Sequence, residues 1–158
     1  RIKVNNSFCE DALNIISSKG YLDSIEITNS YFDALDIDYS EIKINNIDIS
    51  KAGNDCIDLS KGIYEIDTIE AENCFDKGIS IGENSNVDLN IVDLNNTKTA
   101  LAIKDFSIVK INNLKTLNSE YCLKIYQKKQ EFGPSKAIIK NIFCDSEFYV
   151  ENGSILEQ

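Results

Sequence analysis

The chain has 158 residues, a formal net charge of -10 and 42% hydrophobic residues, and it lacks His, Met and Trp. This length and apolar content suffice for one domain with a sizeable core. The acidic charge argues against a nucleic-acid partner, because phosphate binding requires a basic surface. No apolar run is long enough to predict a transmembrane segment.

A pattern with a period of about 22 residues recurs along the chain. Asp33-Ala34-Leu35-Asp36-Ile37 returns one period later as Asp55-Cys56-Ile57-Asp58-Leu59. Copies at the same step begin at Asp11, Lys77, Thr99 and Tyr121. A fixed period in the twenties, with apolar residues at alternate positions, indicates a solenoid.

In chain order, each repeat contains three short pairs of apolar residues with the i, i+2 spacing of a strand that has one buried face. In the second repeat these pairs are Leu35/Ile37, Ile42/Ile44 and Ile47/Ile49. Dense β-branched residues, recurring Asn-rich turns and the lack of an i, i+3, i+4 stripe favour strands over helices. The second and third pairs slip by about one residue in the fourth and fifth repeats.

Three short strands per repeat predict one coil of an all-β, right-handed parallel β-helix solenoid, with about 22 residues per coil and about six to seven coils. Coils stack about 4.8 Å apart, which gives a rod roughly 30 Å tall. We expect residues 1–158 to form a single domain, as a segment of a longer rod, because neither end shows a capping helix. The polar residues 126–136 interrupt the period and predict a protruding loop.

The five cysteines are odd in number and lack the paired spacings of zinc sites. Cys56 and Cys122 occupy the small-residue position of the repeat, which favours a role as buried fillers. Cys144 lies one period after Cys122, so a disulfide between stacked coils is an alternative. The interruption at residues 126–136 leaves that register open.

The first strand of each repeat places polar side chains on an outer face. With Leu35 and Ile37 inside, alternation puts Ala34, Asp36 and Asp38 outside. The next coil presents Cys56, Asp58 and Ser60, and the face then becomes basic. We predict a binding surface on this face formed by Asp36, Asp38, Asp58, Ser80, Lys104 and Tyr126.

Two stacked carboxylates, Asp36 and Asp58, stand about 4.8 Å apart in this prediction. They repel by about 1 kcal/mol in water and by about 3 to 4 kcal/mol at an effective dielectric constant near 20. Solvent screening, backbone hydrogen bonds, a bound calcium ion or a raised pKa could each relieve this repulsion.

These possibilities lead to three interpretations. The aspartates cap strand corners and are solvated, or Asp36 and Asp58 bind calcium, or the carboxylates are catalytic. The candidate catalytic residues are Asp33, Asp55, Asp36, Asp58, Lys77 and Lys104.

The repeat resembles right-handed parallel β-helix proteins of the pectin-lyase-like superfold over nearly the whole chain. Polygalacturonases within that superfold carry, in order, Asn-Thr-Asp, Gly-Asp-Asp-Cys, Gly-His-Gly followed by Ile-Ser-Ile-Gly, and Arg-Ile-Lys. The similar segments here are Tyr31-Phe32-Asp33, Gly53-Asn54-Asp55-Cys56, Asp76-Lys77-Gly78-Ile79-Ser80-Ile81-Gly82 and Ala102-Ile103-Lys104.

The resemblance carries over only part of the family's catalytic pattern. Asp33, Asp55 and Lys104 match it. Asn54 stands where the family has its general acid, Lys77 replaces its histidine, and its arginine is Ala102. An amide cannot protonate a leaving oxygen as a carboxylic acid does. The resemblance therefore implies a β-helix whose hydrolytic site lacks its acid.

We accordingly expect a non-catalytic β-helix module of a secreted or cell-surface protein, which acts as a rigid scaffold for a polysaccharide or another surface protein. The alternative is a polysaccharide-active lyase, epimerase or hydrolase that uses the aspartate ladder. A lyase would need a lowered pKa at Lys77, but the neighbouring Asp55 favours the opposite shift. No cofactor is expected unless the calcium alternative holds.

Overall fold

The computed structural model describes residues 1–158 and consists of thirteen strands without a helix. It therefore has no helix that is long and apolar enough to cross a membrane. The strands are β1 (Ile2–Ser7), β2 (Asp11–Ile16), β3 (Lys19–Ser30), β4 (Asp33–Asp38), β5 (Glu41–Ala52), β6 (Ile57–Ser60), β7 (Ile63–Gly82), β8 (Asn86–Lys104), β9 (Ile108–Leu117), β10 (Tyr121–Tyr126), β11 (Lys136–Cys144), β12 (Glu147–Val150) and β13 (Ile155–Glu157).

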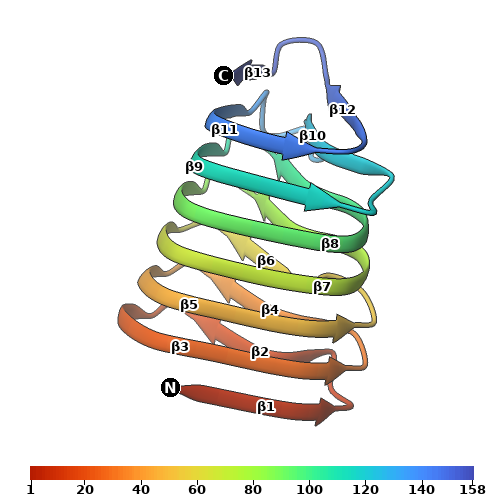
Figure 1. Cartoon of the computed structure of the whole chain (residues 1–158). Helices are drawn as coiled ribbons and strands as arrows, with labels where there is room; N and C mark the ends of the chain where they lie inside the picture. Colours follow the sequence, from red (N-terminus) through yellow and green to blue (C-terminus); the bar gives the residue numbers. More distant parts are fainter.

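All strands pair in parallel and form two ladders. The long-strand ladder follows the order β1-β3-β5-β7-β8-β9-β11-β13. The first-strand ladder consists of β2, β4, β6, the ends of β7 and β8, β10 and β12. In Figure 1 the long strands run from left to right in front, and the chain returns behind them while rising from the N-terminus to the C-terminus. This path is a right-handed coil.

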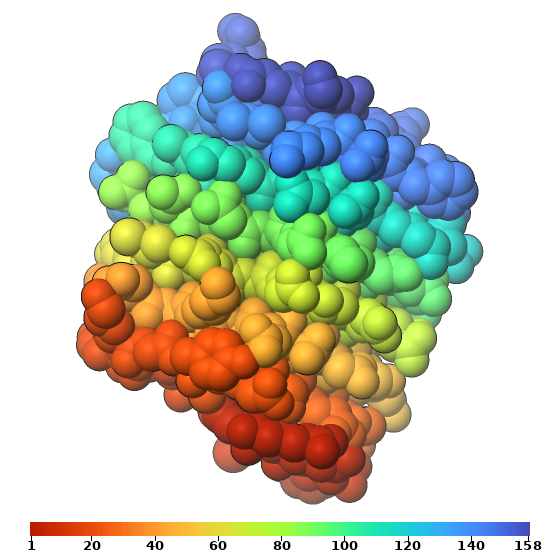
Figure 2. All heavy atoms as spheres, turned by 60° about the vertical axis from the view of Figure 1, so that its left-hand side comes forward, coloured from red at the N-terminus to blue at the C-terminus, as the bar shows by residue number.

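The pairing register confirms the predicted solenoid. Leu35 pairs with Ile57 and Asp36 with Asp58, at the step of the sequence repeat. The chain completes about seven turns. Figure 2 shows the successive coils as stacked layers that follow the sequence from one end of the rod to the other.

The predicted second and third strands of each coil form one bent strand. Ile42, Ile44, Ile47 and Ile49 all lie in β5. At the bend the ladder skips Asn45, whose amide stacks on Asp23 of the coil below. Equivalent side-chain bonds run from Asn90 to Asp67 and from Asn112 to Asn90. These bonds satisfy the polar groups at the bend, so the chain turns without ending the strand.

The predicted slip between repeats is confirmed in the coil that runs from the end of β7 through β8. Ile63 pairs with Asn86 and Cys74 with Thr97, which is one residue beyond the regular step. Lys77 pairs with Thr99 and so returns to the regular step. One coil thus gains a residue at one corner and loses it at another. The strands between the two corners stay aligned.

A core of 35 buried residues fills the rod. It corrects one part of the predicted alternation, because Ala34 and Cys56 are completely buried and not on the outer face. The ladder pairs Asp33 with Asp11 and Leu35 with Leu13 but passes over Ala34. A local bend at strand entry therefore turns this small residue inward, toward the core.

A column of serines marks the corner before each long strand. The column contains Ser18, Ser40, Ser85, Ser107, Ser135 and Ser154, and Gly62 is its single exception.

At Gly62 the missing hydroxyl is supplied by the buried Tyr64. Its hydroxyl donates to the carbonyl oxygens of Ser60 (2.7 Å) and Ile37 (2.9 Å). Ser85 makes the equivalent bonds one coil higher, to Gly82 and Leu59. A Cβ on residue 62 would lie 2.2 Å from the Tyr64 hydroxyl oxygen, so glycine is required there.

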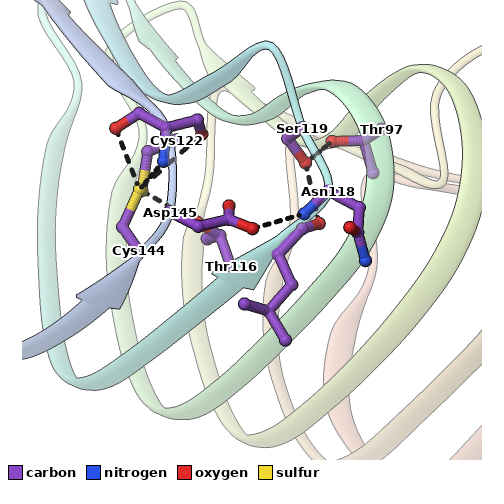
Figure 3. The surroundings of a disulfide bond; sticks show 9 residues. Thr97, Thr116, Asn118, Ser119, Cys122, Cys144 and Asp145 are labelled. Carbon is purple, nitrogen blue, oxygen red and sulfur yellow. Dashed lines mark hydrogen bonds between the residues drawn. A yellow bond between two sulfur atoms is a disulfide. The ribbon is translucent and has the colours of Figure 1, made fainter.

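Two disulfides join corners of the rod, and Cys9 is free and exposed. Cys122 and Cys144 are bonded to each other, as the alternative expected (Figure 3), but not between stacked coils. Cys144 ends the long strand β11 of the same coil, and β12 is the strand that stacks on β10. The bond between Cys56 and Cys74 was not predicted. Their separation of 18 residues is shorter than the period, because the bond spans the corner that closes a single coil.

The segment between β10 and β11 packs against the preceding coil. Asp105 is buried and accepts hydrogen bonds from the backbone N–H groups of Lys128 (2.7 Å) and Lys129 (2.9 Å). Gly133 lies against the ring of Phe106, where a Cβ would approach to 2.4 Å. Residues 127–135 are therefore a strap held to the corner at Asp105.

Candidate functional site

The outward side chains of the first-strand ladder form two rows, which we call the first-strand face. Pairing runs along one row from Asn14 through Asp36, Asp58, Ser80 and Ala102 to Lys124. Along the other row it runs from Ile16 through Asp38 and Ser60 to Gly82, and the row continues with Lys104, whose side chain lies against Gly82 and which pairs with Tyr126. The structure thus brings together all six predicted binding residues on adjacent coils.

The carboxylates at strand entry cap the backbone of the next coil. Asp33 accepts hydrogen bonds from the backbone N–H of Asp55 (2.8 Å) and the side-chain amide of Asn54 (2.7 Å). Asp55 in turn accepts the backbone N–H of Lys77 (3.0 Å) and its ammonium group (3.2 Å). These bonds hold the corners together and occupy groups that the catalytic interpretation requires to be free.

Electrostatics at this column oppose the use of Lys77 as a base. Burial is the largest single influence on Lys77 and lowers its pKa, but hydrogen bonds and charges of Asp76 and Asp55 outweigh burial and raise the pKa overall. Burial also raises the pKa of Asp55 to about 6, although Lys77 acts in the opposite direction. The upward shift at Lys77 agrees with the direction expected from its carboxylate neighbour.

Asp36 and Asp58 are the stacked carboxylates of this face, and the pKa of each is raised. Burial, followed by the charges of Asp38 and Asp58, raises the pKa of Asp36 to about 7. Burial also raises the pKa of Asp58. The Oδ1 atom of Asp58 is buried without a hydrogen-bond partner, which is costly for a charged group. A raised pKa is thus one means by which the stacked carboxylates limit their repulsion.

The basic end of the face is covered. Lys104 is 6% exposed, and its ammonium group donates to Ser80 Oγ at 2.7 Å. Ser80 and Ala102 are 0% exposed. Burial lowers the pKa of Lys104, and the charge of Asp58 counteracts this shift. The middle of the first-strand face is therefore filled by its own side chains.

An ion cluster that the sequence reasoning missed lies beside Asp38. Glu83 pairs with Lys61 (3.1 Å) and with Lys129 of the strap, two coils away in sequence. The hydrogen bond from Lys129, followed by the bond from Lys61, lowers the pKa of Glu83 against the opposing effect of burial. The position of Glu83 in the coil with an extra residue hid it from the repeat pattern.

The carboxylates do not assemble into a metal-binding cluster. The structure contains no group of three or more His, Cys, Asp or Glu side chains arranged to hold an ion. The calcium hypothesis therefore relies on the side chains of Asp36 and Asp58. Two carboxylates supply fewer oxygens than the roughly six to eight that calcium prefers.

No protein-family model, curated protein or solved structure matches the chain. The parallel β-solenoid is thus established by the strand topology alone. Neither the pectin-lyase-like identity nor the polygalacturonase motifs are confirmed.

Proposed function

We propose that this chain is a non-catalytic, rigid β-helix module of a secreted or cell-surface protein, which presents its surface to a polysaccharide or to another surface protein. A solenoid with a continuous core is a stiff scaffold whose elongated faces serve as binding surfaces. Two disulfides fit an oxidising compartment. A pectin-lyase-like ancestry is part of this proposal and rests on the sequence motifs described above.

The observation that carries the proposal is the closure of the first-strand face. Asp55 and Lys77 bind each other, and Lys104 is buried against Ser80. Asn54, at the position of the general acid in the resembled motif, donates its amide to Asp33. A hydrolytic site needs an accessible acid and a base separated by room for substrate. The candidate groups are instead engaged in holding neighbouring coils together.

A partner that binds the first-strand face would contact the accessible residues of that face. Asp36, Asp38, Asp58 and Tyr126 are partly exposed, whereas Ser80 and Lys104 are buried. The two buried residues then support the face from within and do not touch a partner directly.

The test is incubation with a panel of neutral and uronate-containing polysaccharides, with detection of new reducing ends and of unsaturated products. We expect neither product. Activity that disappears in Asp55→Asn or Asp58→Asn, while both variants keep the wild-type circular dichroism spectrum, contradicts the proposal.

A polysaccharide-active enzyme is the second candidate, and one observation favours it. Asp36 has a pKa of about 7 and stacks on Asp58. A carboxyl group protonated near neutral pH beside a second carboxyl group is the usual equipment of a glycosidase. If this candidate is correct, the same panel shows product formation with a pH optimum that changes in Asp36→Asn.

The proposed module requires no cofactor. We expect the melting temperature to be the same in calcium and in chelator. A rise at millimolar calcium that is lost in Asp36→Asn/Asp58→Asn supports the calcium hypothesis instead.

A further inference from the structure

The three most exposed large hydrophobic side chains of the molecule stand in one column. They are Phe8 (84% exposed), Phe75 (79%) and Tyr31 (69%). Phe8 and Tyr31 directly follow the ends of β1 and β3, and Phe75 follows Cys74, where the pairing of β7 with β8 shifts register. The three residues share a column because Ser7 pairs with Ser30, and Ala52 pairs with both Ser30 and Cys74. Aromatic rings that gather on one line of a soluble protein indicate a binding surface more strongly than scattered exposed residues do.

The column continues as a groove along this corner of the rod. Gly53 occupies the place between Tyr31 and Phe75, and a Cβ there would lie 1.9 Å from the carbonyl oxygen of Tyr31. The close packing of the coils thus requires glycine, which leaves a gap between two rings about 10 Å apart, at two coil spacings. The disulfide from Cys56 to Cys74 ties the groove wall to the adjoining strand, so the surface is held rigid before any ligand arrives.

Polar groups beside the rings lack partners. Asparagine amides stack along the corner from Asn29 to Asn6 and from Asn96 to Asn73. Lys51 lies between Asn29 and Asn73 and interrupts this ladder. The amide nitrogen of Asn73 and the amide oxygen of Asn29 consequently make no hydrogen bond within the protein.

The groove has more basic than acidic side chains, unlike the chain as a whole. Its charged lining residues are Lys51, Lys98 and Glu120. Neither lysine takes part in an ion pair of the structure. Two free ammonium groups on a protein of net charge -10 fit a ligand that carries separated negative charges.

We propose that this corner groove binds an extended acidic polysaccharide strand. Tyr31 and Phe75 stack on sugar rings, Lys51 and Lys98 pair with carboxylate or sulfate groups, and the free asparagine groups bind hydroxyls. One sugar unit of an extended strand advances by about the height of one coil, so successive units meet equivalent positions of the column. The inference rests on the proposed display function and assigns it a surface separate from the first-strand face.

The experiment is a binding titration by isothermal calorimetry with hyaluronan (carboxylate), dextran sulfate (sulfate) and dextran (neutral). We expect at least one acidic polymer to bind, more weakly at higher salt, and dextran to bind more weakly than that polymer. Tyr31→Ala/Phe75→Ala should weaken binding of the acidic polymer about tenfold or more. Lys51→Ala/Lys98→Ala should weaken it and reduce its salt dependence. Which acidic polymer binds identifies the charged group.

Matched controls use the same residue types elsewhere. Tyr21→Ala/Phe143→Ala removes two exposed rings, and Lys128→Ala/Lys140→Ala removes two lysines without ion pairs; both should bind like the wild type. Every variant is checked by thermal melting, so that loss of fold is not read as loss of binding.

The groove proposal fails if neither acidic polymer binds, if dextran binds equally well, or if the control pairs weaken binding as much as the groove pairs. It also fails if Tyr126→Ala on the first-strand face abolishes binding while the groove variants do not, an outcome that leaves the proposed function intact. Degradation of a polymer during the titration overturns the proposed non-catalytic function and leaves the groove to be judged by its variants.

Discussion

The carboxyl group of Asp36 couples the stability of the rod to pH. Burial and neighbouring carboxylates raise its pKa from 3.8 to about 7 in the folded chain. Between these values the folded chain binds more protons than the unfolded chain, so stability falls as pH rises through this window. Asp55, with a pKa raised to about 6, acts in the same direction. We predict a lower melting temperature near pH 8 than near pH 5.

Replacement of Asp36 by asparagine removes much of this dependence. Asp36→Asn should melt at a higher temperature than the wild type near pH 8 and show a smaller difference between the two pH values. Calorimetric scans across the pH range measure both effects. Glu131→Gln, an exposed change in the strap, is the control. An unchanged pH profile in Asp36→Asn contradicts the assignment.

Tyr64 and Gly62 are a second coupled pair at the scale of single residues. Tyr64→Phe deletes the hydroxyl that bonds Ser60 and Ile37, and should lower the free energy of unfolding by about 1 kcal/mol. Gly62→Ser alone should cost more, because its Cβ meets both the phenol end of Tyr64 and the backbone carbonyl oxygen of Ser40. Gly62→Ser/Tyr64→Val restores the serine of the column and should recover part of that loss.

Urea titrations of the wild type, Gly62→Ser, Tyr64→Val and the double variant form a double-mutant cycle. If the changes in the free energy of unfolding caused by the substitutions at positions 62 and 64 are purely additive, the predicted coupling is wrong. The sequence repeat does not reveal that Tyr64 replaces the missing serine hydroxyl, because Tyr64 occupies a position at which other coils have an apolar residue, Ile42 or Val87.

At the scale of the element, the strap 127–135 depends on one buried carboxylate. Asp105→Ala removes the acceptor of the N–H groups of Lys128 and Lys129. We predict that trypsin then cleaves after these lysines about tenfold faster, since the strap opens more readily. Mass spectrometry of timed digests locates the cuts. Asp145→Ala, which removes an acceptor from Asn118 in another corner, should leave the strap sites at the wild-type rate.

Sequence periodicity predicted the elements where side chains alternate and failed where the backbone bends. Leu35, Ile37, Ile57 and Leu59 face inward as expected. Ala34 did not follow the alternation, because a bend at strand entry has no signature of its own. The Asn45-Asn46 pair is one of the Asn-rich turn patterns of the sequence, but whether such a turn ends a strand depends on hydrogen bonds to another coil.

The candidate site shows the same limit. Repetition placed Asp36 and Asp58 on adjacent coils and Lys104 two coils beyond Asp58 on the same face, and the strand pairing has this order. It could not show that Lys104 is buried, because burial depends on how long side chains from several coils lie over one another. Glu83 and its partner Lys129 come from a longer coil and from the strap, the two places where the period is broken.

At the scale of the whole molecule, each coil of a solenoid contacts only its neighbours, so a local change in stability affects mainly the adjacent coils. Loss of the Cys56–Cys74 disulfide, in Cys56→Ala/Cys74→Ala, should lower the free energy of unfolding by about 3 kcal/mol. Hydrogen exchange should accelerate chiefly in β5, β6 and β7, and β11 should keep its protection. Exchange monitored by mass spectrometry distinguishes this local loosening from a uniform increase along the rod, which contradicts nearest-neighbour coupling.

The coil that runs from the end of β7 through β8 absorbs one extra residue at its corners, and the ladders stay paired, so the chain is modular. Residues 33–54 contain a full circuit, and their inward positions match those of the next circuit. A variant with a tandem duplication of this segment should therefore fold as a rod with one additional coil, longer by about 4.8 Å. Its ends and both disulfides should be unchanged. The length of the rod is thus set by the number of coils, and the columns of surface residues can be extended or re-spaced in units of one coil.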